Sequence, residues 1–147
     1  MIRVVLAVVL STALLGIAVS SAERADRDRN TALALDELER TADTAERLAA
    51  QNDPVASGET PAGTTVTLSP PDPTFAGTGG RFRIDDDELR WEPSEGQPQT
   101  VPITIPIHVE APTVITERTR LRLRYVRLES QPVIRIRPES ESHSPRS

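Results

Sequence analysis

The stretch VVLAVVLSTALLGIAVSSAERADRDRNTALALDELERTADTAERLAAQND, residues 4–53, decides the fold, because two helical patterns follow each other in it without a proline. Its first part, residues 4–22, contains no charged side chain. A helix rises about 1.5 Å per residue, so these 19 residues cover about 28 Å, close to the roughly 30 Å hydrocarbon core of a bilayer. We therefore predict a transmembrane segment over residues 1–22, with a single span at 4–22 that serves as a signal-anchor.

A second reading of the same segment is a secretory signal that is removed. The apolar core of a signal peptide is usually about 7–15 residues long, which is shorter than this run. The small residues Ser20, Ser21 and Ala22 nevertheless stand where a signal peptidase cleaves. Cleavage after Ala22 would release a secreted protein, and this alternative stays open at the level of the sequence.

The residues after the apolar run favour one long helix that keeps the anchor. Residues 23–51 form an amphipathic continuation, in which apolar side chains recur every three or four positions. Asp36 precedes Arg40 by four positions, which is the stabilising order of charges in a helix. Pro54 ends the helix, because the residue before a proline avoids the α region. The predicted packing seam, for a sheet of the same chain or a like helix of another subunit, consists of Leu35, Leu38, Ala42, Ala45 and Ala49.

Residues 64–138 predict a β-rich domain, which follows a linker at 52–63 and precedes a polar tail at 139–147 that is expected to be disordered. Five segments of the domain alternate apolar and polar side chains with the period of two that a half-buried strand requires. They are TTVTL at 64–68, a GRFRI-DDD-ELRWE hairpin at 80–92, TVPITIPIHVE at 100–110, TVITERTRLRLRYVRL at 113–128 and PVIRIR at 132–137. Two prolines in the third segment remove ladder donors, so we expect it to pair at an edge or irregularly.

Together these patterns predict an α+β fold. The long N-terminal helix, membrane-spanning and then amphipathic, is followed by a head made of a small antiparallel β-sheet or sandwich. Five or six strands are enough to give such a head one apolar face. We expect the seam of the helix to cover that face.

The charges are unevenly spread along the chain. All 17 basic residues are arginine, and 22 acidic residues bring the net charge to −5. This balance argues against a general affinity for nucleic acid or anionic lipid, and the acidic, lysine-free composition suggests a haloarchaeal source. Residues 118–138, however, hold seven arginines and one acid. The strand pattern places six arginines of this block on one candidate face for a partner or an anion, namely Arg118, Arg120, Arg122, Arg124, Arg135 and Arg137.

This arginine face has two interpretations. It binds an acidic partner or another anionic ligand, or it is the solvated side of a sheet, with arginines paired to acids such as Glu110 and Glu117. Aromatic residues make up only 3% of the chain, so bases would find few stacking partners. We therefore predict no nucleic-acid partner.

No residue pattern identifies a reaction. The chain has no cysteine and two isolated histidines, and it carries no nucleophile elbow, phosphate-binding loop or zinc-protease motif. The acidic run at 85–88 lacks the spaced ligands and the glycine of a calcium loop, so we interpret it as a hairpin turn. We predict that the protein is not an enzyme, with no catalytic, cofactor-binding or metal-binding residues and no small-molecule substrate.

The segments MIRVVLAVVLSTALLG and LDELERTADTAERLAAQNDPV resemble small haloarchaeal membrane proteins of an uncharacterised family. The resemblance covers roughly residues 1–55. It implies an association with the ATPase and membrane platform of an archaeal type IV pilus-like secretion system. The layout is similar to that of pilins and pseudopilins, in which an apolar helix continues into an amphipathic helix and then into a β-rich head.

The segment departs from the pilin pattern in two respects. The apolar run follows directly on Met1, Ile2 and Arg3, without a charged leader that ends in glycine, and the first acid is Glu23. We therefore expect a structural or accessory protein of a surface or secretion assembly, which contacts other proteins and does not polymerise. It is expected in the cell membrane as a single-pass protein with an extracytoplasmic C-terminal domain. The alternative is a membrane-tethered or secreted β domain that binds an anionic ligand through the arginine face.

Overall fold

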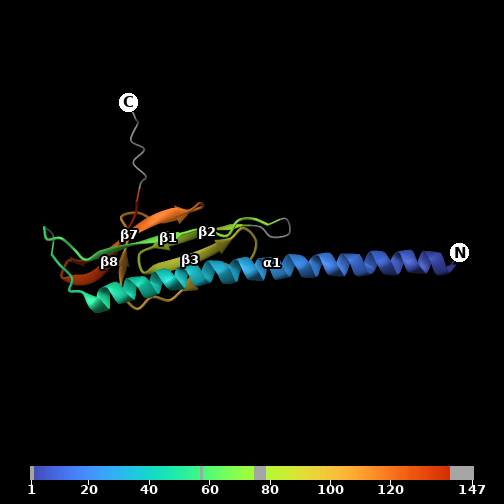
Figure 1. Cartoon of the computed structure of the whole chain (residues 1–147), viewed down its shortest axis with the longest axis horizontal. Helices are drawn as coiled ribbons and strands as arrows, with labels where there is room; N and C mark the ends of the chain where they lie inside the picture. The colour runs from blue at the N-terminus through green and yellow to red at the C-terminus, as the bar shows by residue number, and fades with distance from the viewer. Residues whose placement is uncertain (1, 57, 75–78, 140–147) are drawn as a thin grey trace, which may run out of the picture.

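A computed structural model of the protein describes residues 2–56, 58–74 and 79–139, and this part of the chain contains one helix and eight strands. Helix α1, Ile2–Gln51, is uninterrupted over 50 residues. Figure 1 shows that its first half projects from the head as a bare rod, whereas its second half lies along the strands. The prediction of one long N-terminal helix followed by a β-rich head, and so of an α+β fold, is confirmed.

The helix ends where its last carbonyl groups find other partners. The Asn52 side-chain amide donates to the Leu48 carbonyl at 2.8 Å, which satisfies one carbonyl of the final turn. Pro54 follows within two residues and cannot continue the helical hydrogen bonding. The capping amide and the proline together fix the end of α1 at the far end of the head.

The strands form two four-stranded sheets. One, called here the β7 sheet, has the order β1-β7-β8-β5 and the other, the β3 sheet, has the order β4-β3-β2-β6. The β7 sheet consists of β1 (Gly63–Leu68), β7 (Thr119–Leu128), β8 (Gln131–Pro138) and β5 (Ile107–His108). The β3 sheet consists of β4 (Gln99–Val101), β3 (Glu88–Pro93), β2 (Gly80–Asp85) and β6 (Thr113–Ile115). All neighbouring strands are antiparallel except β5 and β8, which are parallel.

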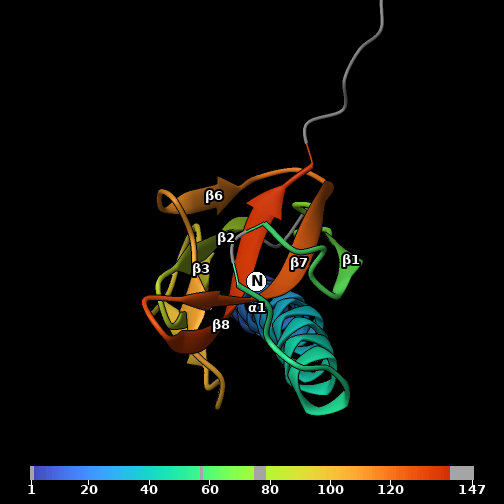
Figure 2. The ribbon, with the colours of Figure 1, turned by 90° about the vertical axis from the view of Figure 1, so that its left-hand side faces the viewer.

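The apolar faces of the two sheets and the second half of α1 enclose one core. Helix α1 contacts β3 and β4 of one sheet and β1 and β7 of the other. It therefore covers the open edge of the core between the two sheets (Figure 2). Trp91 and Phe82 are the largest fully buried side chains, and their rings lie 5.3 Å apart between centroids in a tilted arrangement. From the helix, four apolar residues enter the same core: Ala34, Leu38, Ala42 and Ala45.

One strand prediction needs correction: the segment at 113–128, predicted as one strand, divides into β6 of the β3 sheet and β7 of the β7 sheet. The prediction that the segment at 100–110 pairs at an edge or irregularly is confirmed, since it forms β4 at the edge of the β3 sheet and then β5 at the edge of the β7 sheet. Pro102 and Pro106 lack the backbone N–H that a ladder requires, so the chain crosses between the sheets at these residues.

The predicted linker and tail are partly tied to the head. Within the linker at 52–63, Val55 forms an isolated bridge with Val126, and β1 already begins at Gly63. Within the tail at 139–147, the Glu139 backbone N–H donates to the Arg120 carbonyl at 2.8 Å. Residue 139 therefore extends the pairing of β8 with β7, while residues 140–147 lie outside the described part of the chain.

Candidate functional site

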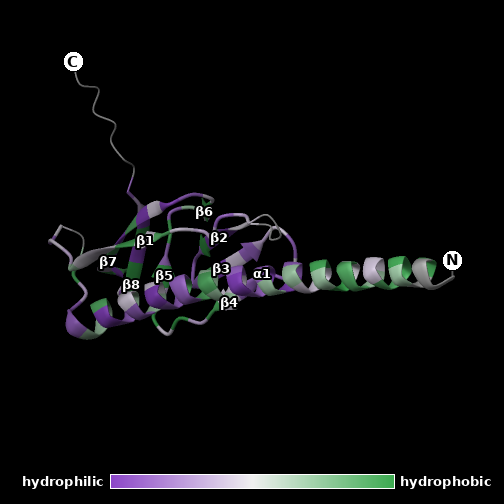
Figure 3. Cartoon of the chain, turned by 45° about the vertical axis from the view of Figure 1, so that its right-hand side comes forward, coloured by the Kyte–Doolittle hydropathy of each residue, from purple (hydrophilic) through white to green (hydrophobic). Residues whose placement is uncertain are grey.

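The first candidate surface is the apolar half of α1. Figure 3 shows hydrophobic residues along the N-terminal half of the helix, where no strand covers it. Its large apolar side chains are exposed, from Val5 at 61% to Val19 at 53%, whereas Leu38 in the second half is fully buried. By length and composition, α1 is the one helix in the described residues that could cross a membrane. An apolar surface of this extent needs an apolar partner, and the head does not provide one.

The head touches α1 directly after this apolar half. The Thr74 hydroxyl donates to the Asp26 carboxylate at 3.2 Å, and the Arg27 guanidinium lies 3.6 Å from the Glu95 carboxylate. Exposed contacts of this kind contribute little to stability. They do place the loops before β2 and after β3 about one helical turn beyond residue 22. The head therefore sits close to the end of the predicted span.

The structure places the predicted packing seam against the sheets of the same chain. Leu38, Ala42 and Ala45 are buried, and Leu35 and Ala49 are half-buried. Three further residues on this side of the helix are buried, namely Asn30, Ala34 and Thr41. The sequence pattern missed Asn30 and Thr41 because a polar residue does not count toward an apolar stripe.

Two glutamates of α1 bind backbone groups of the head. Glu37 accepts a hydrogen bond from the Ser69 backbone N–H at 2.8 Å, just after β1. Glu46 accepts one from the Thr104 backbone N–H at 3.0 Å and another from the Thr104 hydroxyl at 2.7 Å. These two donors lower the pKa of Glu46, since they favour its charged form. The helix thus holds the segment that crosses between the sheets.

We expect the Glu46 contact to make the stability of the head depend on pH. Because the pKa of Glu46 is lowered on folding, its contribution is present at neutral pH and is lost as the pH falls through the folded-state pKa. Glu46→Gln keeps an acceptor oxygen but does not titrate, so its melting temperature should fall less between pH 7 and acidic pH than that of the wild type. Glu39→Gln, at an exposed position of the same helix, is the control and should follow the wild-type profile. Identical profiles for all three proteins would contradict this role of Glu46.

The acidic hairpin turn also has a structural role. The Asp87 carboxylate accepts a hydrogen bond from the Ile107 backbone N–H, and the Asp86 carboxylate accepts one from the Val109 N–H, both at 2.9 Å. Asp86 also lies 3.2 Å from Nδ1 of His108. These hydrogen bonds therefore connect the β2–β3 turn of the β3 sheet to β5 of the β7 sheet.

We predict that Asp87→Ala lowers the free energy of unfolding by about 1–3 kcal/mol, because the part-buried Ile107 N–H loses its acceptor. Asp87 has φ 60, a left-handed conformation that asparagine tolerates better than alanine. Asp87→Asn keeps both the acceptor oxygen and this tolerance, so it should stay within about 0.5 kcal/mol of the wild type. Denaturant unfolding measures the free energy of unfolding of both variants. Equal losses in the two would show that the hydrogen bond from Ile107 to Asp87 does not stabilise the head.

The arginine face lies on the outer side of the β7 sheet. Of its six residues Arg135 is half-buried and the others are exposed. The strand register sets Arg122 directly opposite Arg137, and Arg124 directly opposite Arg135. At one end of the face, a hollow of about 600 Å³ is lined by Glu117, Arg118, Thr119, Arg120 and Glu139.

Within the described residues, no group of three or more histidine, cysteine, aspartate or glutamate side chains is placed to hold a metal ion. His108 contacts a single carboxylate, that of Asp86. The two lowered glutamate pKa values have structural causes: Thr104 acts on Glu46, and Arg90 and Thr100 act on Glu88. The surfaces that remain as candidates for function are the apolar half of α1 and the arginine face.

Comparison with known proteins identifies the family of the chain. A family described as "Domain of unknown function (DUF7311)" matches residues 1–139. No curated protein and no solved structure matches the chain. The match includes both the apolar half of α1 and the whole described head.

Proposed function

Because the chain belongs to the DUF7311 family, described only as a domain of unknown function, we propose its role from its own architecture: it is a membrane-anchored structural or accessory protein of a surface or secretion assembly. It acts through protein contacts and not as an enzyme. Its head lies on the extracytoplasmic side of the membrane.

One observation carries this proposal. A single uninterrupted helix, Ile2–Gln51, is exposed and apolar in its first half and forms part of the core of the head in its second half. No flexible linker separates the two halves of this helix, so the orientation of the head relative to the anchor is restricted. Such a coupling suits a part that holds its neighbours in a fixed geometry.

The layout also supports a pilin-like role. Pilins and pseudopilins share the order of an apolar helix, its amphipathic continuation and a β-rich head. The acidic, lysine-free composition fits the haloarchaeal membrane proteins that the sequence resembles. Since the apolar run at residues 4–22 contains no acid, the accessory role fits better than that of a filament subunit.

The role in an assembly is tested by extraction from native membranes with mild detergent. We expect the protein to migrate in a species larger than one chain and to co-purify with other membrane proteins. Ala25→Pro, at an exposed position between the two halves of α1, should kink the helix, leave the head folded and reduce the larger species. Ala25→Ser is the matched control. A strictly monomeric wild-type protein without co-purifying proteins would contradict the proposal.

The orientation is tested by cysteine labelling in intact cells, since the chain has no cysteine of its own. Gln97→Cys, in the exposed loop after β3, should react with a maleimide that cannot cross the membrane. Ser11→Cys, in the apolar half of α1, should stay unreactive because lipid surrounds it. Reaction of Gln97→Cys only after lysis would place the head in the cytoplasm, the side that the positive-inside rule favours for Arg24, Arg27 and Arg29.

A further inference from the structure

The arginine face places like charges directly against each other. Arg122 opposes Arg137 and Arg124 opposes Arg135 across the β7–β8 ladder. Side chains in directly opposed positions have Cβ atoms about 4.5–5.5 Å apart, so two positive charges there destabilise the pair. Along β7, every second residue points to the same face, at intervals of about 7 Å. The result is a grid of guanidinium groups on one sheet face.

Carboxylates of the same chain neutralise only part of this grid. Arg122 lies 2.8 Å from Glu139, and Arg137 pairs with Glu110. Within the described residues, four of the six arginines have no carboxylate oxygen within 4.0 Å, namely Arg118, Arg120, Arg124 and Arg135. The buried Nε of Arg135 also has no hydrogen-bond partner among these residues. An external acceptor would therefore meet unused donors on the three exposed arginines, Arg118, Arg120 and Arg124, whereas the Nε of Arg135 is closed off from solvent.

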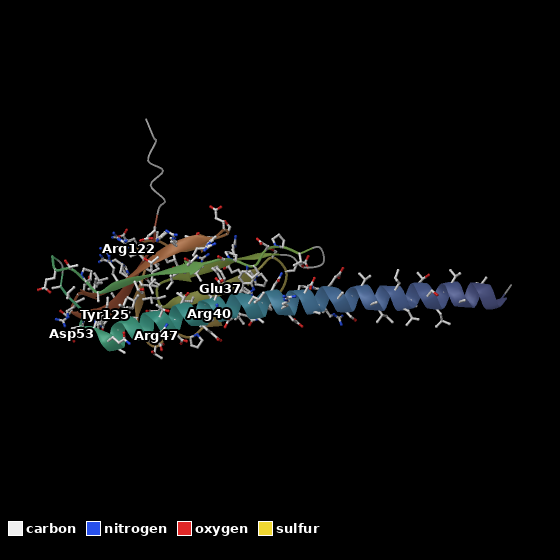
Figure 4. All side chains as sticks on the ribbon, in the orientation of Figure 1. Glu37, Arg40, Arg47, Asp53, Arg122 and Tyr125 are labelled. Atoms are coloured by element: carbon white, nitrogen blue, oxygen red, sulfur yellow. The ribbon has the colours of Figure 1, made fainter. Side chains whose placement is uncertain are left out.

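The orientation of the arginine face relative to α1 decides what can reach it. The strands of the head lie to one side of the second half of α1 (Figure 1). Arg122 lies on the side of the head away from α1, whereas Arg40 and Arg47 lie on the helix (Figure 4). If α1 stands across a membrane, a ligand of the arginine face lies beside the head. The headgroups of the same membrane lie at its base.

The chemistry of the face fits carboxylates on a protein surface. Guanidinium groups bind carboxylates through two parallel hydrogen bonds, and arginine is enriched at protein interfaces. The three aromatic residues that the structure describes, Phe82, Trp91 and Tyr125, are all buried. Among the described residues, the face therefore offers no aromatic platform on which a base can stack. Its β1 border carries the exposed Thr65 and Thr67 opposite Arg122 and Arg120, which adds neutral hydrogen-bonding groups.

We propose that the outer face of the β7 sheet docks an acidic protein surface, a row of aspartate and glutamate side chains on a neighbouring component of the same membrane assembly. This inference rests on the proposed function, since it names the contact surface through which the head acts. The partner neutralises the opposed arginines, so binding removes a repulsion that the isolated head retains.

The test uses the full chain in nanodiscs of neutral lipid and measures binding of fluorescent poly-L-glutamate at low ionic strength. The variant Arg120→Gln with Arg124→Gln removes two arginines that lack a carboxylate partner in the described residues. It should weaken binding at least about tenfold, as expected for the loss of two charge-assisted contacts. The matched control, Arg24→Gln with Arg29→Gln, removes two exposed arginines of α1 and should change binding by less than about twofold.

Two further readouts keep the result interpretable. The melting temperature of the Arg120/Arg124 variant should equal or exceed that of the wild type at low salt, since Arg124 no longer opposes Arg135. Heparin and vesicles containing phosphatidylglycerol should bind less tightly than poly-L-glutamate at equal charge concentration. Tighter binding of either by the wild type, with the same loss in the variant, would overturn the proposal in favour of a polysaccharide or a lipid surface.

Native extraction separates this inference from the proposed function. If the wild type and the Arg120/Arg124 variant form the same larger species, the assembly exists and the arginine face is not its contact. If the wild type is monomeric, the proposed function itself fails. Loss of the larger species in this variant, but not in the Arg24/Arg29 control, is the result that supports both.

Discussion

Leu38→Ala is expected to lower the free energy of unfolding of the head by about 2–5 kcal/mol, the usual cost of a large-to-small change in a core. Leu38 is fully buried where the second half of α1 meets both sheets. Alanine would remove three carbon atoms and leave a cavity, because strands on both sides prevent the helix from moving inward. Denaturant unfolding in detergent measures the loss, with the fluorescence of Trp91, the single tryptophan, as the probe of the core.

The matched control for this experiment is Leu33→Ala. Leu33 belongs to the same helix but is 49% exposed, so its truncation should change the free energy of unfolding by no more than about 0.5 kcal/mol. Both variants change the intrinsic helix propensity equally, and the difference between them measures burial alone. Equal effects of the two would mean that α1 does not form part of the core of the head.

Gly80→Ala is expected to destabilise the head by about 1–3 kcal/mol or more, because the added methyl group has no room. A Cβ atom at Gly80 would lie 2.5 Å from Cη2 of Trp91 and 2.6 Å from the carbonyl oxygen of Glu92. Trp91 is 1% exposed and its ring packs beside that of Phe82, so neither the ring nor the strand backbone can yield freely. Thermal unfolding of the variant should show a lower melting temperature.

The neighbouring glycine provides the control. A Cβ atom at Gly79 would lie 3.4 Å or more from its nearest neighbours, the atoms of Pro71 and Pro73, which is ordinary van der Waals contact. Gly79→Ala should therefore be neutral or slightly stabilising, since alanine restricts the unfolded chain. If Gly79→Ala cost as much as Gly80→Ala, the close packing of Trp91 against β2 would not be the cause.

The helix could be predicted from the sequence because its signals are local. The absence of proline before Pro54, the charge pair Asp36–Arg40 and the apolar stripe each act within a few residues. The same holds for the hairpin of β2 and β3, in which Phe82 faces Trp91 and Ile84 faces Leu89 as the alternation indicates.

The division into two sheets could not be predicted, because alternation shows that a strand has one buried face but not which strand lies beside it. Segment 113–128 keeps the same alternation on both sides of the turn that separates β6 from β7. Strand β5 pairs in parallel with β8, and its Ile107 N–H also donates to Asp87, a residue 20 positions away in the sequence. Long-range contacts of this kind leave no periodic signal.

The arginine face could likewise be predicted only in part from the sequence. Alternation along β7 put Arg120, Arg122 and Arg124 on one side, but only the register reveals that Arg135 and Arg137 stand opposite two of them. The acids that pair with the face, Glu110 and Glu139, come from separate segments. The structure was therefore needed to show which arginines of the face lack a carboxylate partner.

The anchor is the central claim, and the state of the chain in native membranes tests it most directly. Membranes are washed with alkaline carbonate, and the protein that remains is analysed by intact mass and N-terminal sequencing. We predict that the chain stays in the membrane pellet and retains residues 4–22, since the exposed apolar half of α1 needs lipid around it. A soluble chain that begins at Glu23 would contradict the account, because the apolar half would then be a cleaved signal and not the membrane half of one long helix.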